Sequence, residues 1–260
     1  MHYFSLFVKY VGTGSRVSTL DGSKVSDWID QYPHWSPSAG HDAVSIVQRA
    51  CNWAAKKGHI DQSPVVNVPD KPAKTRREVV YSPVEWSELR ALVTDQEFGD
   101  LLDFMWDTGC RPLEARTIEA RHVDLQNDLI VFPPSEAKGR KNERVIFLTP
   151  VSRAICERLA KQWPDGPIMR NAKGSPWTKD SINCRFQRLK KKLGKRACAY
   201  GIRHSYATEG LKQGMDSLTL AQLMGHQDSS MVARTYSHLA RNPRYLREQA
   251  KKLRAKCELD

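Results

Sequence analysis

The spacing of apolar residues changes character only once along this chain, and that change limits the folds open to it. Most segments repeat apolar residues at i, i+3 and i+4, the period of an amphipathic helix. Two short β-rich runs interrupt this pattern, "DLIVFPP" (128–134) and "ERVIFLTP" (143–150), and they flank the polar, glycine-containing "SEAKGRKN". Such a pair predicts a β-hairpin. The sequence therefore predicts a mainly α fold with one small antiparallel β-sheet.

The helices expected on either side of the hairpin carry start and stop signals. "SPVEWSELRALV" (82–93) opens with a serine cap, a proline in the first turn and Glu85 at the capping-box position. "EFGDLLDFMWDTG" (97–109) closes on Gly109. After the hairpin, helical spacing covers residues 151–163, 178–193, 200–213, 217–224, 229–238 and 241–256.

A proline-rich, basic segment without an apolar period separates two parts of the chain. "NVPDKPAKTRREVVYSP" (67–83) holds three prolines and four basic residues, a composition typical of an interdomain linker. We therefore expect a helical domain over residues 1–70, a basic linker over 71–81 and a larger domain over 82–260. The first dozen residues would have little to pack on, so the first domain is expected to be shortened at its N-terminus.

Charge and cysteine usage narrow the class of protein. The net charge is +12, nearly all of it after residue 72, which favours a polyanionic partner such as nucleic acid over an ordinary soluble basic protein. Six scattered cysteines form no C-x-x-C pair, which argues against a zinc site or disulfides and favours a reducing cytosol. No apolar run approaches the ~18 residues of a membrane span, and the N-terminus is too polar for a signal peptide.

Two arginines are candidates for phosphate chemistry. Breaking a phosphodiester without a metal needs a nucleophile, cations on the non-bridging oxygens and an acid for the leaving oxygen. Arg111 and Arg203 suit the oxygens, because a guanidinium is planar, permanently charged and able to bind in a bidentate manner. The alternative for either arginine is a structural salt bridge, with Glu114 or Glu209.

The surroundings and order of these residues resemble the catalytic domain of the tyrosine recombinase (phage integrase) family. The likeness rests on "TGCRPLEA", on "IRHSYAT" with "LMGH" some twenty residues later, and on a tyrosine ten residues after that histidine. It covers roughly residues 78–245, and residues 15–65 resemble the family's smaller core-binding helical domain. Each motif is weak alone, whereas the ordered set is specific.

The resemblance assigns the parts of a strand-cleavage site. Tyr236 would attack DNA to give a 3′-phosphotyrosyl link, Lys138 would be the general acid for the 5′-hydroxyl, and His226 would donate to a phosphate oxygen or act near the nucleophile. Tyr200 stands where the family most often has His, and a phenol can donate one hydrogen bond but carries no positive charge. The implied catalytic set is Arg111, Lys138, Tyr200, Arg203, His226 and Tyr236, with no metal and no cofactor.

Several neighbours compete for these roles. Arg140 and Lys141 stand close to Lys138 in the hairpin turn. The rivals of Tyr236 for the nucleophile's role in this half of the chain are Tyr200, Tyr206 and Tyr245. Of these, Tyr206 is expected to pack in the core, and Tyr245, in the basic C-terminal helix, is the more plausible competitor.

A second basic segment, "RFQRLKKKLGKRA" (185–197), predicts a helix with an apolar seam and a cationic face suited to phosphates. The alternative is a solvated basic helix. The predicted DNA-binding residues are Arg140, Lys141, Arg185, Arg188, Lys190, Lys191 and Lys192.

Together these features imply a site-specific DNA recombinase or integrase of a mobile element, acting in the cytoplasm on double-stranded DNA. By resemblance it would work as a homotetramer on two DNA sites, with the C-terminal helix as the assembly element. Two alternatives stay open. One is a DNA-binding relative with weak or lost catalysis, and the other is a type IB topoisomerase-like or telomere-resolving activity.

Overall fold

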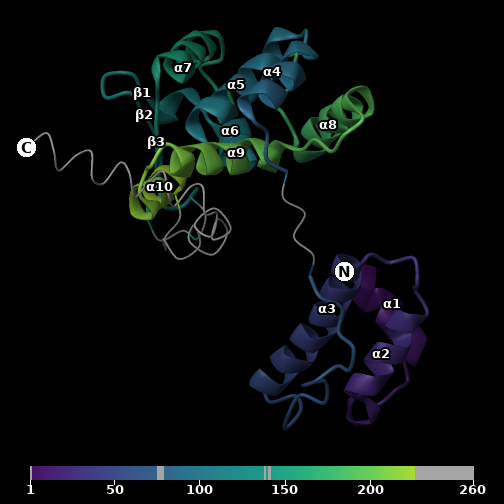
Figure 1. Cartoon of the computed structure of the whole chain (residues 1–260). Coiled ribbons are helices and arrows are strands. Elements are labelled where there is room, and N and C mark those ends of the chain that lie inside the picture. The colour runs from purple at the N-terminus through teal and green to yellow at the C-terminus, as the bar shows by residue number, and fades with distance from the viewer. Residues whose placement is uncertain (1, 75–78, 138, 140–141, 226–260) are drawn as a thin grey trace, which may run out of the picture. The chain divides into compact units, whose positions relative to one another are not determined.

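The computed structural model describes residues 2–74, 79–137, 139 and 142–225. The chain divides into two compact units, Met1–Arg77 and Glu78–Asp260 (Figure 1). Lys138, Arg140, Lys141, His226 and Tyr236 lie outside the described residues, as do the helices expected over 229–238 and 241–256.

The first unit is a small helical bundle with an aromatic core. Its elements are α1 (His2–Val11), a 3₁₀ turn (Val17–Thr19), α2 (Gly22–Asp30) and α3 (Pro37–Lys56). Phe7 of α1 is buried and meets Trp28 of α2 edge to face, with 5.0 Å between the ring centroids. Val44 and Val47 of α3 close the same core. The expectation that the first dozen residues have little to pack on is therefore wrong, because α1 packs on both α2 and α3.

The second unit is mainly helical with one three-stranded sheet. Its elements are α4 (Pro83–Ala91), α5 (Gln96–Thr108), α6 (Pro112–Thr117), a 3₁₀ turn (Ala120–His122), β1 (Val123–Asp124), β2 (Leu129–Phe132), β3 (Arg144–Phe147), α7 (Pro150–Gln162), α8 (Lys179–Leu193), α9 (Ala199–Lys212) and α10 (Ser217–Met224). The strands run antiparallel in the order β1-β2-β3. The predicted fold class and hairpin are confirmed, and β1, at two residues, is too short to show a period.

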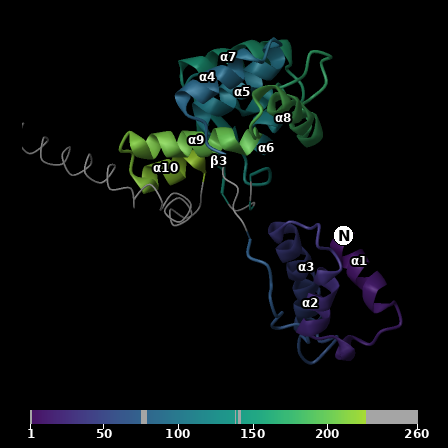
Figure 2. The same ribbon diagram turned by 45° about the vertical axis from the view of Figure 1, so that its right-hand side comes forward.

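Helix α5 forms the centre of this unit. It lies between α7 and α9 in both views (Figures 1 and 2), and its side chains Phe98, Leu101, Leu102 and Phe104 are fully buried. Gly109 ends the helix in the left-handed conformation (φ 62°), which glycine adopts without steric strain. The ring of Tyr206 fills the space where any larger residue at this position would place its Cβ. The chain can therefore turn sharply into α6.

Helix α9 is buried on several sides because its residues are small. A Cβ on Gly201 would lie 2.8 Å from the ring of Tyr81, so only glycine permits this approach. The Tyr81 hydroxyl accepts from the backbone N–H of Cys198 (2.8 Å) and donates to the Cys198 carbonyl (3.1 Å). The Tyr81 backbone N–H donates to Ser205 Oγ (2.7 Å). These bonds fix α9, and with it Arg203, against the start of the unit.

Across the described parts of the chain, no helix combines the length and apolar character needed to cross a membrane.

Candidate active site

Arg111 stands at the start of α6, directly after the turn at Gly109. Its backbone N–H donates to Glu114 Oε2 (2.8 Å), and its Nη1 lies 2.6 Å from Glu114 Oε1. Its Nη2 donates to the carbonyl oxygen of Gly225 (2.8 Å), at the end of α10. The salt bridge with Glu114, raised as an alternative to a phosphate-binding role, is thus present. The salt bridge orients the guanidinium, and the bond to Gly225 connects the start of α6 to the end of α10.

Arg203 lies on α9 with only 4% of its surface exposed. Its Nη1 donates to the Gly109 carbonyl (2.8 Å), and its Nη2 donates to the Met224 carbonyl (2.7 Å). Both acceptors are carbonyls at helix ends, where oxygens have no partner within their own helix. These two bonds orient Arg203 between the turn at Gly109 and the end of α10, the same two segments that adjoin Arg111. Both acceptors are neutral carbonyl oxygens.

A third guanidinium, from Arg144 of β3, joins these two and was missed by the sequence analysis. Arg144 is 6% exposed, and its Nε lies 3.5 Å from Glu114 Oε2. Arg144 lies on the same buried face of the strand as Ile146, two residues later. The alternation of buried and exposed positions in "ERVIFL" was therefore the signal that could have found it. The structure therefore brings Arg111 and Arg144 to the carboxylate of Glu114, with Arg203 of α9 close enough to feel its charge.

Burial and mutual repulsion shape the titration of this arginine cluster, defined as Arg111, Arg144, Arg203 and Glu114. Burial lowers the pKa of Arg203 to about 10, helped by the nearby Arg111, and the group stays charged at neutral pH. Burial acts to raise the pKa of Glu114, but Arg144 and Arg111 outweigh it and the pKa falls below its usual value. The cluster therefore carries two more positive charges than negative ones, which favours an anionic ligand.

Cys110 lies beside the cluster but is not suited to act as a nucleophile. Its side chain is fully buried. Burial, followed by the charge of Glu114, raises the pKa of the thiol to about 12. A thiol with such a pKa stays protonated at neutral pH, and the protonated form is a poor nucleophile.

Tyr200 lies on α9 three residues before Arg203, but its environment is opposite. It is 56% exposed, so its phenol is open to a partner from outside the chain. Tyr206, by contrast, is half-buried against Gly109, and burial raises its pKa. The two tyrosines of α9 thus differ in access, and only Tyr200 presents its ring to solvent.

Two of the predicted site residues, His226 and Lys138, follow shortly after positions that the structure describes. Gly225, whose carbonyl receives Arg111, is the C-cap of α10 with φ 66° and immediately precedes His226. Before the hairpin turn, Glu136 is held by Arg121 (2.9 Å) and by the ring of His122 (3.0 Å). Two ordered anchors, at Gly225 and Glu136, therefore adjoin His226 and Lys138 in sequence.

The predicted basic face on α8 divides into two kinds of residue. Ile182, Phe186 and Leu189 form the expected apolar seam. Arg185 pairs with Asp95 and lies over the ring of Phe98, with its Cζ 4.7 Å from the ring centroid, so its charge is engaged within the protein. The other four predicted residues of the helix are exposed: Arg188, Lys190, Lys191 and Lys192.

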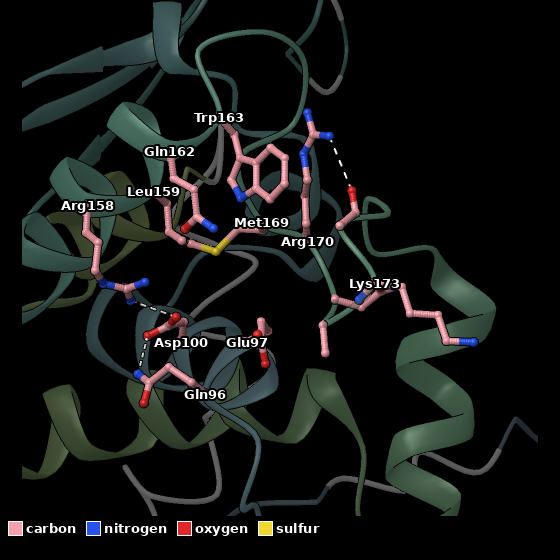
Figure 3. Close-up of a pocket in the computed structure, with 13 residues that line it drawn as sticks. Gln96, Glu97, Asp100, Arg158, Leu159, Gln162, Trp163, Met169, Arg170 and Lys173 are labelled. Atoms are coloured by element: carbon pink, nitrogen blue, oxygen red, sulfur yellow. Dashed lines mark hydrogen bonds and ion pairs between the residues drawn. The ribbon is translucent and has the colours of Figure 1, made fainter.

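A separate cavity of about 390 Å³ lies between α5, α7 and the turn at residues 170–174 (Figure 3). It contains none of the predicted site residues. Arg158 pairs there with the buried Asp100 (2.7 Å), which also accepts from Gln96 (2.8 Å), and Arg170 lies over Trp163. The residues that line this cavity include three cationic and two acidic side chains, and the charge of Arg158 is matched by Asp100. Its excess of positive charge is therefore smaller than that of the arginine cluster. In the described ranges, no group of three His, Cys, Asp or Glu residues could hold a metal ion.

Solved structures share this fold over nearly the whole chain. The Tn1549 transposon integrase, solved in complex with a circular intermediate DNA, superposes with a TM-score of 0.78 over 97% of this chain and 91% of that protein, at 16% identity. The fold is therefore that of DNA integrases and tyrosine recombinases.

Sequence comparison places the chain within one family. The model of the phage integrase family matches residues 89–242, and the chain belongs to that family. Its relatives include tyrosine recombinase XerA of Saccharolobus solfataricus, 28% identical over 54% of this chain and 45% of XerA. Tyrosine recombinase XerC of Lactobacillus delbrueckii is 29% identical over 54% of this chain and 50% of XerC. The chain thus spans about half the length of the curated relatives it matches.

Proposed function

We propose that this protein is a site-specific DNA recombinase or integrase that cuts and rejoins DNA through a 3′-phosphotyrosyl intermediate. The observation that carries the proposal is the buried arginine cluster, which gathers three guanidiniums and one carboxylate and is held in fixed orientation by Glu114 and by the carbonyls of Gly109, Met224 and Gly225. A phosphate diester in transesterification supplies the complementary negative charge. Family membership and the fold support the same function.

In the proposed reaction, Arg111 and Arg203 bind the non-bridging oxygens of the scissile phosphate. The Tyr236 oxygen attacks phosphorus, the phenolic proton passes to solvent or a neighbouring base, and the bond from phosphorus to the 5′-oxygen breaks. Lys138 protonates the departing 5′-oxygen. The phosphotyrosyl ester keeps the energy of the diester, so attack by a free 5′-hydroxyl reverses the step without ATP or a metal ion.

The remaining residues have supporting roles in this proposal. His226 follows the Gly225 turn and donates to a phosphate oxygen, and the exposed phenol of Tyr200 donates a further hydrogen bond. The exposed cations of α8, together with Arg140 and Lys141, contact the DNA backbone. The assembly is a homotetramer on two duplexes, formed in the cytoplasm and serving a mobile element.

Covalent capture from a pool of duplex DNA tests this function on many candidate target sites at once. Genomic and randomised fragments are incubated with the full chain, stopped in detergent, and DNA that remains attached to protein is sequenced. Wild type and Tyr245→Phe should retain the same sequences, and Tyr236→Phe should retain none. The rate of adduct formation is then measured on a duplex of the recovered site that carries a nick beside the cleavage position. The short fragment with the 5′-hydroxyl dissociates after cleavage, so the strand cannot be rejoined and the adduct accumulates.

Two results would overturn the proposal. One is wild-type protein that binds DNA tightly yet forms no covalent product with any fragment. The other is a product that survives Tyr236→Phe.

The second candidate is a DNA-binding relative with weak catalysis, which the phenol at position 200 favours. A neutral phenol cannot take up and return a proton near pH 7 as an imidazole can. Under this alternative, Tyr200→His would create or strongly raise adduct formation from a low wild-type level.

A further inference from the structure

We propose that Arg144 is a positioning residue of the cleavage site, which holds Arg111 in its working orientation by bracing both of that residue's side-chain partners. The inference rests on the proposed function and adds a residue to it. Arg144 belongs to none of the motifs from which the site was predicted, and it comes to the cluster from the sheet.

The first contact joins Arg144 to Glu114. The carboxylate places Oε1 on Arg111 Nη1 (2.6 Å) and Oε2 on the Arg111 backbone N–H (2.8 Å). Arg144 Nε lies 3.5 Å from that same Oε2. The charges of Arg144 and Arg111, together with the hydrogen bonds from Arg111, keep the pKa of Glu114 low against its burial. Loss of Arg144 would therefore weaken the acceptor that fixes Arg111.

The second contact joins Arg144 to the end of α10. A Cβ on Gly225 would lie 2.6 Å from Arg144 Nε and 2.7 Å from its Cζ, so the Arg144 side chain occupies the space that a larger residue at position 225 would need. The carbonyl of that same glycine accepts from Arg111 Nη2 (2.8 Å). Arg144 thus touches both groups that orient Arg111, and it supports the turn that leads into His226.

The strand holds Arg144 itself in place. Its Nη1 donates to the carbonyl of Val145 (2.5 Å), and Phe132 of β2 is its register partner. Its Nη2 and its Nε are buried, and neither makes a hydrogen bond with the described residues. A buried donor without an acceptor costs free energy. Because of this cost, we infer that Arg144 contributes less to the stability of the fold than to the orientation of Arg111.

The expected phenotype follows from these contacts. Arg144→Met removes the charge and the planar group while keeping an unbranched apolar stem. We expect it to fold with a Tm close to that of wild type and to bind the recovered DNA site within about threefold of wild-type affinity. The rate of adduct formation on the nicked duplex should fall by about 10- to 100-fold, the effect of small errors in positioning. Arg144→Lys keeps the positive charge but not the planar guanidinium, and the rate of adduct formation should fall by a similar factor.

A matched control and a direct readout make the test decisive. Arg158→Met breaks an ion pair with another buried carboxylate, Asp100, in the separate cavity (Figure 3), and should leave cleavage unchanged. In ¹⁵N spectra of the free full-length protein, the two Nη atoms of Arg111 should give distinct signals in wild type and in Arg158→Met. In Arg144→Met they should average, because the guanidinium rotates freely.

The outcomes separate the two proposals. A folded Arg144→Met protein with wild-type cleavage, or with the Arg111 signals unchanged, would overturn the positioning role. A loss of cleavage that only matches lost folding or lost DNA affinity would also overturn it. If wild type forms no adduct on any DNA, the proposed function fails, and the Arg111 spectra alone then decide whether Arg144 orients that side chain.

Discussion

At the scale of single residues, Tyr200 is the residue of the predicted catalytic set, among those that the structure describes, whose side chain is the most open to substitution. It lies one turn before the buried Arg203, yet it is largely exposed. Among the described residues its side chain is not closely packed, so a change of side chain there alters chemistry more than folding. The position therefore allows the contribution of a protonatable donor to be measured almost free of structural effects.

We expect Tyr200→His to change the free energy of unfolding by less than about 0.5 kcal/mol, as is usual for exposed positions. Adduct formation should be preserved or raised, and the gain should grow below about pH 6.5, where an imidazole carries a positive charge. Chemical denaturation and single-turnover cleavage between pH 5.5 and 8 measure the two effects. Tyr206→His is the contrasting variant, because Tyr206 packs on Gly109 and its replacement should destabilise the unit. A cleavage-dead but folded Tyr200→His protein would contradict this expectation.

At the scale of elements, the base of the β2–β3 hairpin is held by a histidine whose ring nitrogens have distinct roles. The backbone N–H of Glu119 donates to His122 Nδ1 (3.0 Å), so the neutral ring carries its proton on Nε2. That nitrogen lies 3.0 Å from Glu136 Oε2, and Glu136 also receives Arg121. The strand end before Lys138 is therefore anchored by a neutral imidazole.

This arrangement predicts a pH dependence of stability. Burial and the charge of Arg121 lower the pKa of His122 below its usual value of 6.5. The unfolded chain therefore takes up a proton near pH 6.5 while the folded chain does not. The contribution of His122 is complete above pH 6.5 and declines as the pH falls through the folded pKa. Urea unfolding of wild type and His122→Gln between pH 5 and 8 should show a steeper loss in wild type. Parallel curves would refute this prediction.

Local signals predicted most helix ends, and long-range contacts explain what they missed. The serine cap and Glu85 predicted before α4 form a complete capping box, with bonds of 3.2 and 2.9 Å, because both partners lie within one turn. Strand β1 was missed because it has two residues and exists only through pairing with β2. Tyr81, expected in the linker, is buried against α9, a contact that no local pattern records.

At the scale of the whole molecule, the net charge of +12 predicts binding to DNA that weakens steeply with salt. Each phosphate contact contributes about 0.9 to the slope of log K against log salt concentration. Replacing Lys190, Lys191 and Lys192 together by Gln should lower that slope by about 2 to 3. Fluorescence anisotropy of a labelled duplex across a salt series gives the slope.

The contrasting variant on the same helix is Arg185→Gln. Arg185 is already engaged by Asp95 and the ring of Phe98, so its loss should reduce stability while changing the slope by much less. An equal change of slope in both proteins would show that Arg185 reaches the DNA after all. An unchanged slope in the triple variant would remove α8 from the proposed DNA surface.

The sequence by itself determined the mainly helical class, the hairpin and the family. The helix period, the helix caps and the motifs all depend on residues that lie close together along the chain. It also identified Arg111 and Arg203 as a pair. Only the tertiary structure decided which groups meet them: Arg144 from the sheet, Glu114 shared between two guanidiniums, and the carbonyls of Gly109, Met224 and Gly225. The physical reason is that a buried charge needs partners, and these come from segments up to 114 residues apart that only folding brings together.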